Sequence, residues 1–234
     1  MNITLPDGSV RELNVGSTGL DLALDIGPGL AKAAIAVSVN GEQKDLADPI
    51  NEDSEVSIIT IDSSEGLEIM RHTLTAQVLA RAVKNLYPGT KLAIGPTITD
   101  GFYYDFEFKN PISPDDLHKI EKEMKKIIDS KSSITKVLYS KEDAIEIFKK
   151  NNETYKESII QESDQVDNFQ LYYQDNNEFV DLCRGPHLPN LKQIGSFKLT
   201  KLAGAYWKGD SKNKMLTRIY GTAWKNDKDL NSYL

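Results

Sequence analysis

The sequence is poor in cysteine, since Cys183 is the only one among 234 residues. An intrachain disulfide and a zinc site built from several cysteines are therefore excluded. Long apolar runs are also missing, because no stretch approaches the roughly 20 apolar residues that a membrane-spanning helix needs. The first residues lack the basic start and apolar run of a secretory signal. These absences predict a cytoplasmic protein that has no membrane partner.

Acidic residues outnumber basic ones, with 35 Asp and Glu against 28 Lys and Arg. The net charge of −7 argues against a general binder of nucleic acids, and therefore against DNA as a partner. Residues 1–62 hold three basic and eleven acidic side chains, whereas residues 190–234 hold nine basic and three acidic ones. The basic C-terminal stretch is typical of a solvated face or of one surface turned toward phosphates. Charge alone leaves both interpretations open.

The first part of the chain has the pattern of a small β-rich domain. Apolar runs separated by turn residues predict strand 2–5, strand 10–13, a helix capped by Thr18, strand 34–39 and strand 55–61. This order in so short a stretch favours a β-grasp, ubiquitin-like fold. The polar segment at 62–66 interrupts the pattern, so we place a domain boundary after residue 62.

The remainder, residues 63–234, alternates helical and extended patterns. A helical period of apolar residues covers 67–86, and capped helices are expected to begin at Ser113 and Ser140. Strands are predicted at 91–94, 102–106, 169–173, 179–182, 197–202 and 205–208. These patterns favour an α+β domain, with helices packed on a largely antiparallel sheet.

The segment at 179–187 holds the densest group of reactive side chains. Its extended run places Asp181 and Cys183 on the same side of a strand, because side chains two residues apart share a face. The Arg-Gly-Pro turn that follows presents His187. A thiol, a carboxylate and an imidazole so close together suit a site that positions and deprotonates a water. On local chemistry alone, a buried structural cysteine and histidine are the commoner roles of such residues.

The same segment, Asp-Leu-Cys-Arg-Gly-Pro-His, resembles the signature of the editing domain of bacterial threonine–tRNA ligases, and more loosely that of alanine–tRNA ligases. Further segments agree with that domain in order along the chain: Ala93–Pro96, Gly101–Phe106, Ala203–Ser211 and Met215–Trp224. Residues 1–62 resemble the small β-grasp domain, or TGS domain, that precedes it in these enzymes. The resemblance therefore spans the whole chain.

The resemblance implies an aminoacyl-tRNA deacylase, which hydrolyses the ester of serine mischarged on tRNA(Thr). It assigns Cys183 and His187 to the catalytic group, and Lys156, Asp181 and Tyr104 to the binding of the seryl group. In this family an aminoacylation core follows, with ATP, magnesium, zinc and most of the dimer interface. That core is missing from these residues, so no cofactor is expected here and a dimer is expected only through the core.

One helix departs from the family pattern. The family begins it with His-x-x-x-His, two imidazoles on one face, whereas Ala76 lies four residues after His72. Alignment from the other end of the helix puts Gln77 and Thr73 at the two histidine positions. His72 enters the site if one extra residue lies between Arg71 and Ala76. We therefore add His72 to the catalytic group and Gln77 and Thr73 to the binding group; with one imidazole missing, no metal is expected.

Two other functions fit parts of the sequence. A non-catalytic tRNA-binding module with a degenerate site would use the basic stretch after residue 190, where Tyr206, Trp207 and Trp224 are suited to stacking on bases. A β-grasp domain can also be a regulatory ligand sensor, but residues 1–62 lack a basic or Gly-rich phosphate site. Hydrolysis of aminoacyl-tRNA separates the enzyme from the binding module. The third histidine, His118, is expected to be exposed and inert.

Overall fold

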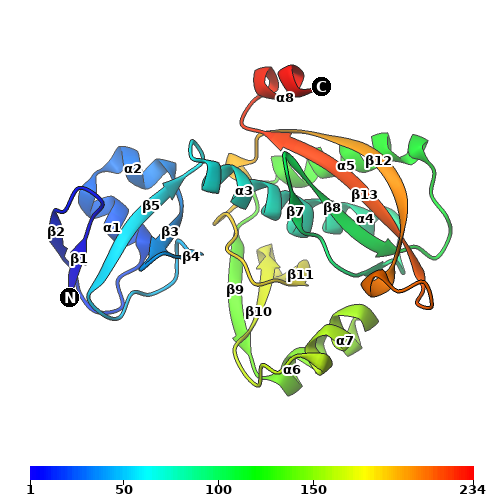
Figure 1. The fold of residues 1–234 in the computed structure, drawn as a ribbon, viewed down its shortest axis with the longest axis horizontal. Coiled ribbons are helices and arrows are strands. Elements are labelled where there is room, and N and C mark those ends of the chain that lie inside the picture. Colours follow the sequence, from blue (N-terminus) through cyan, green and yellow to red (C-terminus); the bar gives the residue numbers. More distant parts are fainter.

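The computed structural model describes residues 1–234 apart from the side chain of Asn176. The chain forms three sheets, and the strands of the smallest lie in sequence between those of the largest. In Figure 1 the first sheet, coloured blue to cyan, lies to one side, and the other two sheets lie beyond it with their helices.

The first sheet has the strand order β2-β1-β5-β3-β4. Its elements are β1 (Asn2–Thr4), β2 (Val10–Glu12), α1 (Gly19–Ile26), α2 (Pro28–Ala33), β3 (Ala34–Val39), β4 (Glu42–Asp45) and β5 (Ser54–Thr60). Strands β1 and β5 are parallel and the other neighbours are antiparallel, which confirms the predicted β-grasp fold. Strand β4 was not predicted, because its sequence Glu-Gln-Lys-Asp has no apolar alternation; it lies at the edge of the sheet.

Helix α1 covers this sheet with its apolar side. Leu22 packs with Ile3 and Val37 in the core of the domain. The helix begins as predicted, since the Thr18 side chain accepts a hydrogen bond from the backbone N–H of Asp21 and the Asp21 carboxylate accepts one from Thr18 N–H.

A continuous helical rod enters the second part of the molecule. It consists of α3 (Ser64–Thr73), the π-helical segment η1 (Leu74–Leu79) and α4 (Ala80–Leu86). All residues of η1 are buried. Leu74 and Val78 pack with Phe102 and Ile219 in the largest core of the protein. A helix buried all round is fixed by its surroundings, so its side chains hold definite directions.

The largest sheet has the order β12-β13-β8-β6, and β7 also pairs with β8. Its strands are β6 (Lys91–Leu92), β7 (Thr97–Ile98), β8 (Gly101–Glu107), β12 (Ser196–Tyr206) and β13 (Met215–Trp224), all antiparallel to their neighbours. It is accompanied by η2 (Pro114–Asp116), α5 (Leu117–Asp129) and α8 (Asp227–Tyr233). The buried stripe of α5 is the predicted one, Leu117, Ile120, Met124 and Ile127.

The third sheet is smaller, with the order β11-β10-β9 and antiparallel pairing. It comprises β9 (Ile134–Tyr139), β10 (Phe169–Gln174) and β11 (Phe179–Leu182), with helices α6 (Lys141–Lys150) and α7 (Thr154–Glu162). Phe148 and Ile160 of these helices pack on Leu171 of β10. Short 3-10 turns complete the chain: η3 (Asp175–Asn177), η4 (Leu191–Gln193) and η5 (Trp207–Gly209).

The α+β class is thus confirmed, with some differences in detail. Strands β7, β9 and β13 were not predicted. The segments expected as strands 197–202 and 205–208 merge into the single strand β12, which ends where η5 begins. The register of β12 shifts between Leu199 and Lys201, which keeps the two halves paired with one partner. The His118 side chain is 70% exposed, as predicted.

In the described part of the chain, no helix combines the length and the apolar character needed to cross a membrane.

Candidate active site

The π-helical segment η1 decides which side chains of the rod face the site. Inside it the Ala80 N–H donates to the Thr75 carbonyl, five residues back instead of four. A π segment of this kind absorbs one extra residue without changing the faces of the flanking helices. The sequence alone left open whether the helix carries one extra residue between Arg71 and Ala76, and the π segment accommodates such a residue. It lets His72, at the end of α3, enter the site while α4 keeps its own packing.

His72 meets the segment after β11 at a short distance. Its Nε2 lies 3.1 Å from Sγ of Cys183, and its ring stacks on that of His187 with 4.5 Å between centroids. The backbone N–H of Gly185 also donates to Cys183 Sγ, at 3.3 Å. The three residues predicted as the catalytic group are therefore brought together, although His72 lies more than a hundred residues before the other two.

Thr73 determines the proton arrangement of His187. Its Oγ1 donates to the Ile69 carbonyl at 2.9 Å, lies 3.0 Å from Nδ1 of His187 and accepts from the Leu188 N–H at 3.0 Å. Because the hydroxyl has one proton and gives it to Ile69, Nδ1 of His187 is the donor in the bond to Thr73. Nε2 of the neutral His187 ring is then an acceptor, and it is buried with no protein partner among the described residues.

Burial keeps both imidazoles neutral. Desolvation lowers the pKa of His72 below its ordinary 6.5, and a backbone hydrogen bond to Pro186 and the charge of Asp181 oppose this only in part. Desolvation likewise lowers the pKa of His187, and the neighbouring Cys183 opposes this only in part. A neutral imidazole at pH 7 has a free lone pair, which a group that accepts a proton from water requires.

A buried ion pair adjoins this cluster. Lys156 of α7 places Nζ 2.9 Å from Oδ1 of Asp181, and both side chains are at most 4% exposed. Oδ1 also accepts from the Leu182 N–H at 2.8 Å, and Oδ2 accepts from the Tyr104 hydroxyl at 2.8 Å. Burial and the charge of Asp181 raise the pKa of Tyr104 well above its usual value, so its hydroxyl stays a donor. A carboxylate accepts about four hydrogen bonds, so Oδ2 retains room for one more donor.

These groups line one cavity of about 570 Å³. Its wall includes His72, Ala76, Gly95, Tyr104, Lys156, Asp181 and Cys183. His187 is not part of that wall; it lies behind His72 and is 2% exposed. The cavity thus presents a thiol, an imidazole, an ammonium and a carboxylate to whatever enters it.

The structure places the remaining predicted residues away from the cavity. Gln77 is fully buried, and its carbonyl and amide oxygens both accept from Gln174 Nε2, at 2.7 and 3.0 Å. Ala76 occupies the position facing the cavity instead. The assignment of Gln77 to substrate binding is therefore corrected, because η1 turns its side chain toward β10. Thr73 is also fully buried and contacts His187 rather than the cavity.

Sequence reasoning missed two groups that support the cluster. Tyr172 of β10 packs its ring edge-on against His187, with 4.5 Å between centroids. Asp45, at the end of β4 in the β-grasp domain, accepts from the Tyr172 hydroxyl at 2.7 Å and from the His187 N–H at 2.9 Å. No local motif marks either residue, since both contacts depend on how the sheets pack.

Three side chains could contribute ligand atoms to a metal. Ligand atoms of His72, Cys183 and His187 lie within 4.8 Å of one another, and no further residue joins this group in the described chain. Structural zinc sites have four protein ligands and catalytic ones three with an open position. Nδ1 of His187 is bonded to Thr73 and Nε2 of His72 is turned to Cys183. The absence of a metal from the working site stays a prediction.

Gly185 supplies a direct test of the support around the site. Its φ is +66°, and a Cβ there would lie 2.0 Å from the Tyr172 hydroxyl oxygen. Gly185→Ala is therefore expected to cost more than the roughly 1–3 kcal/mol of the unfavourable backbone conformation, because Tyr172 must also move. Gly209→Ala is the matched control, since φ there is +69° and nothing lies within 4 Å.

Thermal and denaturant unfolding of the two glycine variants provides the measurement. The Gly185 variant is expected to lose clearly more free energy of unfolding than the Gly209 variant. Equal losses would show that Tyr172 and its neighbours move without a further loss of free energy of unfolding, and that the turn does not fix the site.

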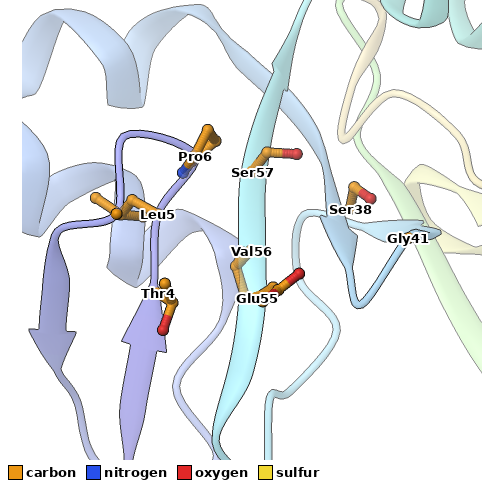
Figure 2. Close-up of a pocket in the computed structure, with 9 residues that line it drawn as sticks. Thr4, Leu5, Pro6, Ser38, Gly41, Glu55, Val56 and Ser57 are labelled. Carbon is orange, nitrogen blue, oxygen red and sulfur yellow. The ribbon is translucent and has the colours of Figure 1, made fainter.

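A separate hollow of about 410 Å³ lies on the β-grasp domain. Figure 2 shows its wall, made of the turn after β1 and of residues from β3 and β5. It is lined by Thr4, Leu5, Pro6, Gly8, Ser38, Gly41, Glu55, Val56 and Ser57. Glu55 is the single ionisable group in that set, so the wall has no pair of groups for acid–base chemistry and no cation for a phosphate.

Two domain families match the chain. Residues 1–60 match the TGS domain, and residues 170–220 match the threonyl and alanyl tRNA synthetase second additional domain. The second match includes Asp181, Cys183 and His187. His72, Tyr104 and Lys156 lie outside it and join the site through the fold.

Similar proteins extend this likeness over the whole chain. The threonine–tRNA ligase of Hahella chejuensis is 52% identical over 232 residues, which are 99% of this chain and 36% of that enzyme. The threonine–tRNA ligase of Paramagnetospirillum magneticum is 53% identical over 234 residues, again 36% of its length. That of Francisella philomiragia is 50% identical and covers 100% of this chain. The chain thus spans 36% of the length of these relatives.

Proposed function

We propose that this chain, which aligns with about a third of a threonine–tRNA ligase and matches the TGS domain and the threonyl and alanyl tRNA synthetase second additional domain, edits mischarged tRNA. The reaction is hydrolysis of the ester that joins serine to the terminal ribose of tRNA(Thr). The observation that carries this proposal is the contact of 3.1 Å between His72 and Cys183 on the wall of a cavity that also holds Lys156 and Asp181. The partner is tRNA(Thr) charged with serine, in the cytoplasm.

The catalytic group acts on a water. A neutral imidazole carries one proton on one of its two nitrogens. When His72 donates that proton to the Pro186 carbonyl, its Nε2 is an acceptor. His72 then takes a proton from a water held beside Cys183, and the water oxygen attacks the ester carbon. The proton passes to the departing ribose oxygen, which leaves free serine and intact tRNA. The thiol of Cys183 orients the water and forms no covalent bond in this proposal, because the water is the nucleophile.

The buried ion pair holds the other end of the substrate. The free acceptor position on Oδ2 of Asp181 suits the α-ammonium of the seryl group. Lys156 is the cation on the cavity wall nearest to Asp181, the carboxylate that would bind this ammonium. The Lys156 ammonium is suited to stabilise the negative charge that develops at the ester oxygen. Tyr104 keeps the carboxylate in its orientation.

Energetics explain why such a site is needed. Serine differs from threonine by one methyl group, and a missing methyl changes binding by only about 1–3 kcal/mol. A second pocket that accepts serine and excludes threonine supplies the rest of the discrimination. The parent enzyme's aminoacylation, with ATP, magnesium and zinc, and its dimer contacts belong to its other two-thirds in this proposal.

The test is hydrolysis of seryl-tRNA(Thr) and threonyl-tRNA(Thr) by this chain, each against a reaction without protein. Rapid loss of serine with threonine retained is the expected result. Binding of tRNA without acceleration of either reaction would contradict the deacylase function and favour the non-catalytic tRNA-binding module.

A further inference from the structure

The β-grasp domain contacts His187 and Tyr172, behind the cavity wall, through the side chain of Asp45. Asp45 ends the edge strand β4, is 9% exposed and points into the boundary between the two parts of the chain. Lys136 of β9 approaches the same boundary, with Nζ 3.3 Å from Asp45 Oδ2 and 2.6 Å from Asp48 Oδ1. The two aspartates therefore share a cation, but they differ in what else they hold.

The two oxygens of Asp45 bind different parts of the site. Oδ1 accepts from the backbone N–H of His187 at 2.9 Å, across 142 residues of sequence. Oδ2 accepts from the Tyr172 hydroxyl at 2.7 Å. Hydrogen bonds from buried donors to a charged acceptor are among the stronger ones in proteins. One carboxylate thus fixes both the backbone of His187 and the ring that packs against it.

Ring contacts connect His187, whose position Asp45 fixes, to His72 on the cavity wall. The Tyr172 ring packs perpendicular to the His187 ring and His187 stacks on His72, each with 4.5 Å between centroids. Asp45 itself touches neither the cavity nor His72, so it acts through other groups. Sub-ångström errors in the placement of reacting groups are enough to slow an enzyme.

From these contacts we infer that Asp45 of the β-grasp domain is a positioning residue for the editing site, which holds His187 and, through it, His72. The inference rests on the proposed deacylase function for its catalytic consequence. The first domain is then part of the editing machinery through its carboxylate, not only a neighbour of it.

Three variants separate positioning from general stability. Asp45→Ala removes both acceptors, and kcat for hydrolysis of seryl-tRNA(Thr) is expected to fall about 10- to 100-fold with KM unchanged. Asp45→Asn retains an acceptor for the His187 N–H and is expected to restore most of the rate. Asp25→Ala is the control, because it removes another carboxylate of the same domain, paired with Arg11 on the surface, without touching His187 or Tyr172.

Amide hydrogen exchange by NMR gives a readout that is independent of activity. In Asp45→Ala the His187 amide is expected to lose protection, while the amide of Ile219, buried in β13, keeps its own. Unchanged exchange at His187, or equal losses at both amides, overturns the inference, as does an equal fall of kcat in Asp25→Ala. If the unaltered protein hydrolyses no seryl-tRNA, the deacylase function fails, and exchange at His187 alone decides whether Asp45 holds the segment.

Discussion

Replacement of His72 by alanine is expected to slow hydrolysis of seryl-tRNA(Thr) by about 10²- to 10³-fold, the usual contribution of a positioned acid–base group. The reason is geometric. His72 is the histidine on the cavity wall, its Nε2 lies 3.1 Å from Cys183 Sγ, and burial keeps its pKa below 6.5. With alanine, Cys183 remains but no group accepts the proton from the water.

Two further variants frame this measurement. His72→Gln keeps a hydrogen-bonding side chain but cannot take a proton, so it is expected to lose nearly as much rate as the alanine variant. His118→Ala changes an exposed imidazole of α5 and is expected to leave the rate unchanged. If His72→Gln retains the full rate, His72 serves only to bind, and the proton goes elsewhere.

The pH dependence follows from the direction of the pKa shift. Because the pKa of His72 in the folded protein lies below its ordinary 6.5, the neutral ring predominates at pH 6.5 and above. The fall in rate of the unaltered protein at low pH is therefore expected to have its midpoint below pH 6.5, as the ring takes up a proton. A midpoint at or above pH 6.5 would contradict the assignment.

Lys156→Met is expected to lower the free energy of unfolding by about 3–5 kcal/mol, the usual cost of breaking a buried ion pair from one side. The pair of Lys156 and Asp181 is almost fully buried. Without the ammonium, the carboxylate keeps only the Tyr104 hydroxyl and the Leu182 N–H as donors. Denaturant unfolding measures the loss.

A double variant separates stability from function. Lys156→Met combined with Asp181→Asn removes the isolated charge and keeps acceptors for Tyr104 and Leu182, so much of the lost stability is expected to return. Hydrolysis of seryl-tRNA is not expected to return, because both groups that hold the seryl end are gone. Lys208→Met breaks an exposed pair with Glu162 and is expected to change stability little. A stable but inactive Lys156→Met protein would show that the ion pair is not needed for the fold.

The role of the β-grasp domain follows from the same kind of argument. A domain with eleven acidic and three basic residues is a poor surface for tRNA. One of those acids, Asp45, is used inside the protein, where it binds the backbone of His187 and the Tyr172 hydroxyl. We therefore expect the domain to contribute to editing by positioning residues of the site, and not by contact with RNA.

Patterns between near neighbours were sufficient for much of the molecule. Apolar periodicity and turn residues predicted the β-grasp order, the buried stripe of α5 and the α+β class, because these properties repeat every two to four residues along one element. The segment from Asp181 to His187 was identified for the same reason, since its reactive groups lie within one strand and turn. Strands β4 and β9 were missed because their sequences lack a clear apolar alternation.

Only the tertiary structure decided how the site is assembled. The single extra residue of η1 turns Gln77 toward Gln174 and leaves Ala76 at the cavity, and no periodicity in the sequence specifies where a buried helix takes up such a residue. The contact of His72 with Cys183, the pairing of Lys156 with Asp181 and the reach of Asp45 to His187 join separate elements. The residue types of this protein therefore determine which chemistry is available, and the packing of its sheets determines which groups meet, because side chains far apart in sequence are brought together only when the cores between them close.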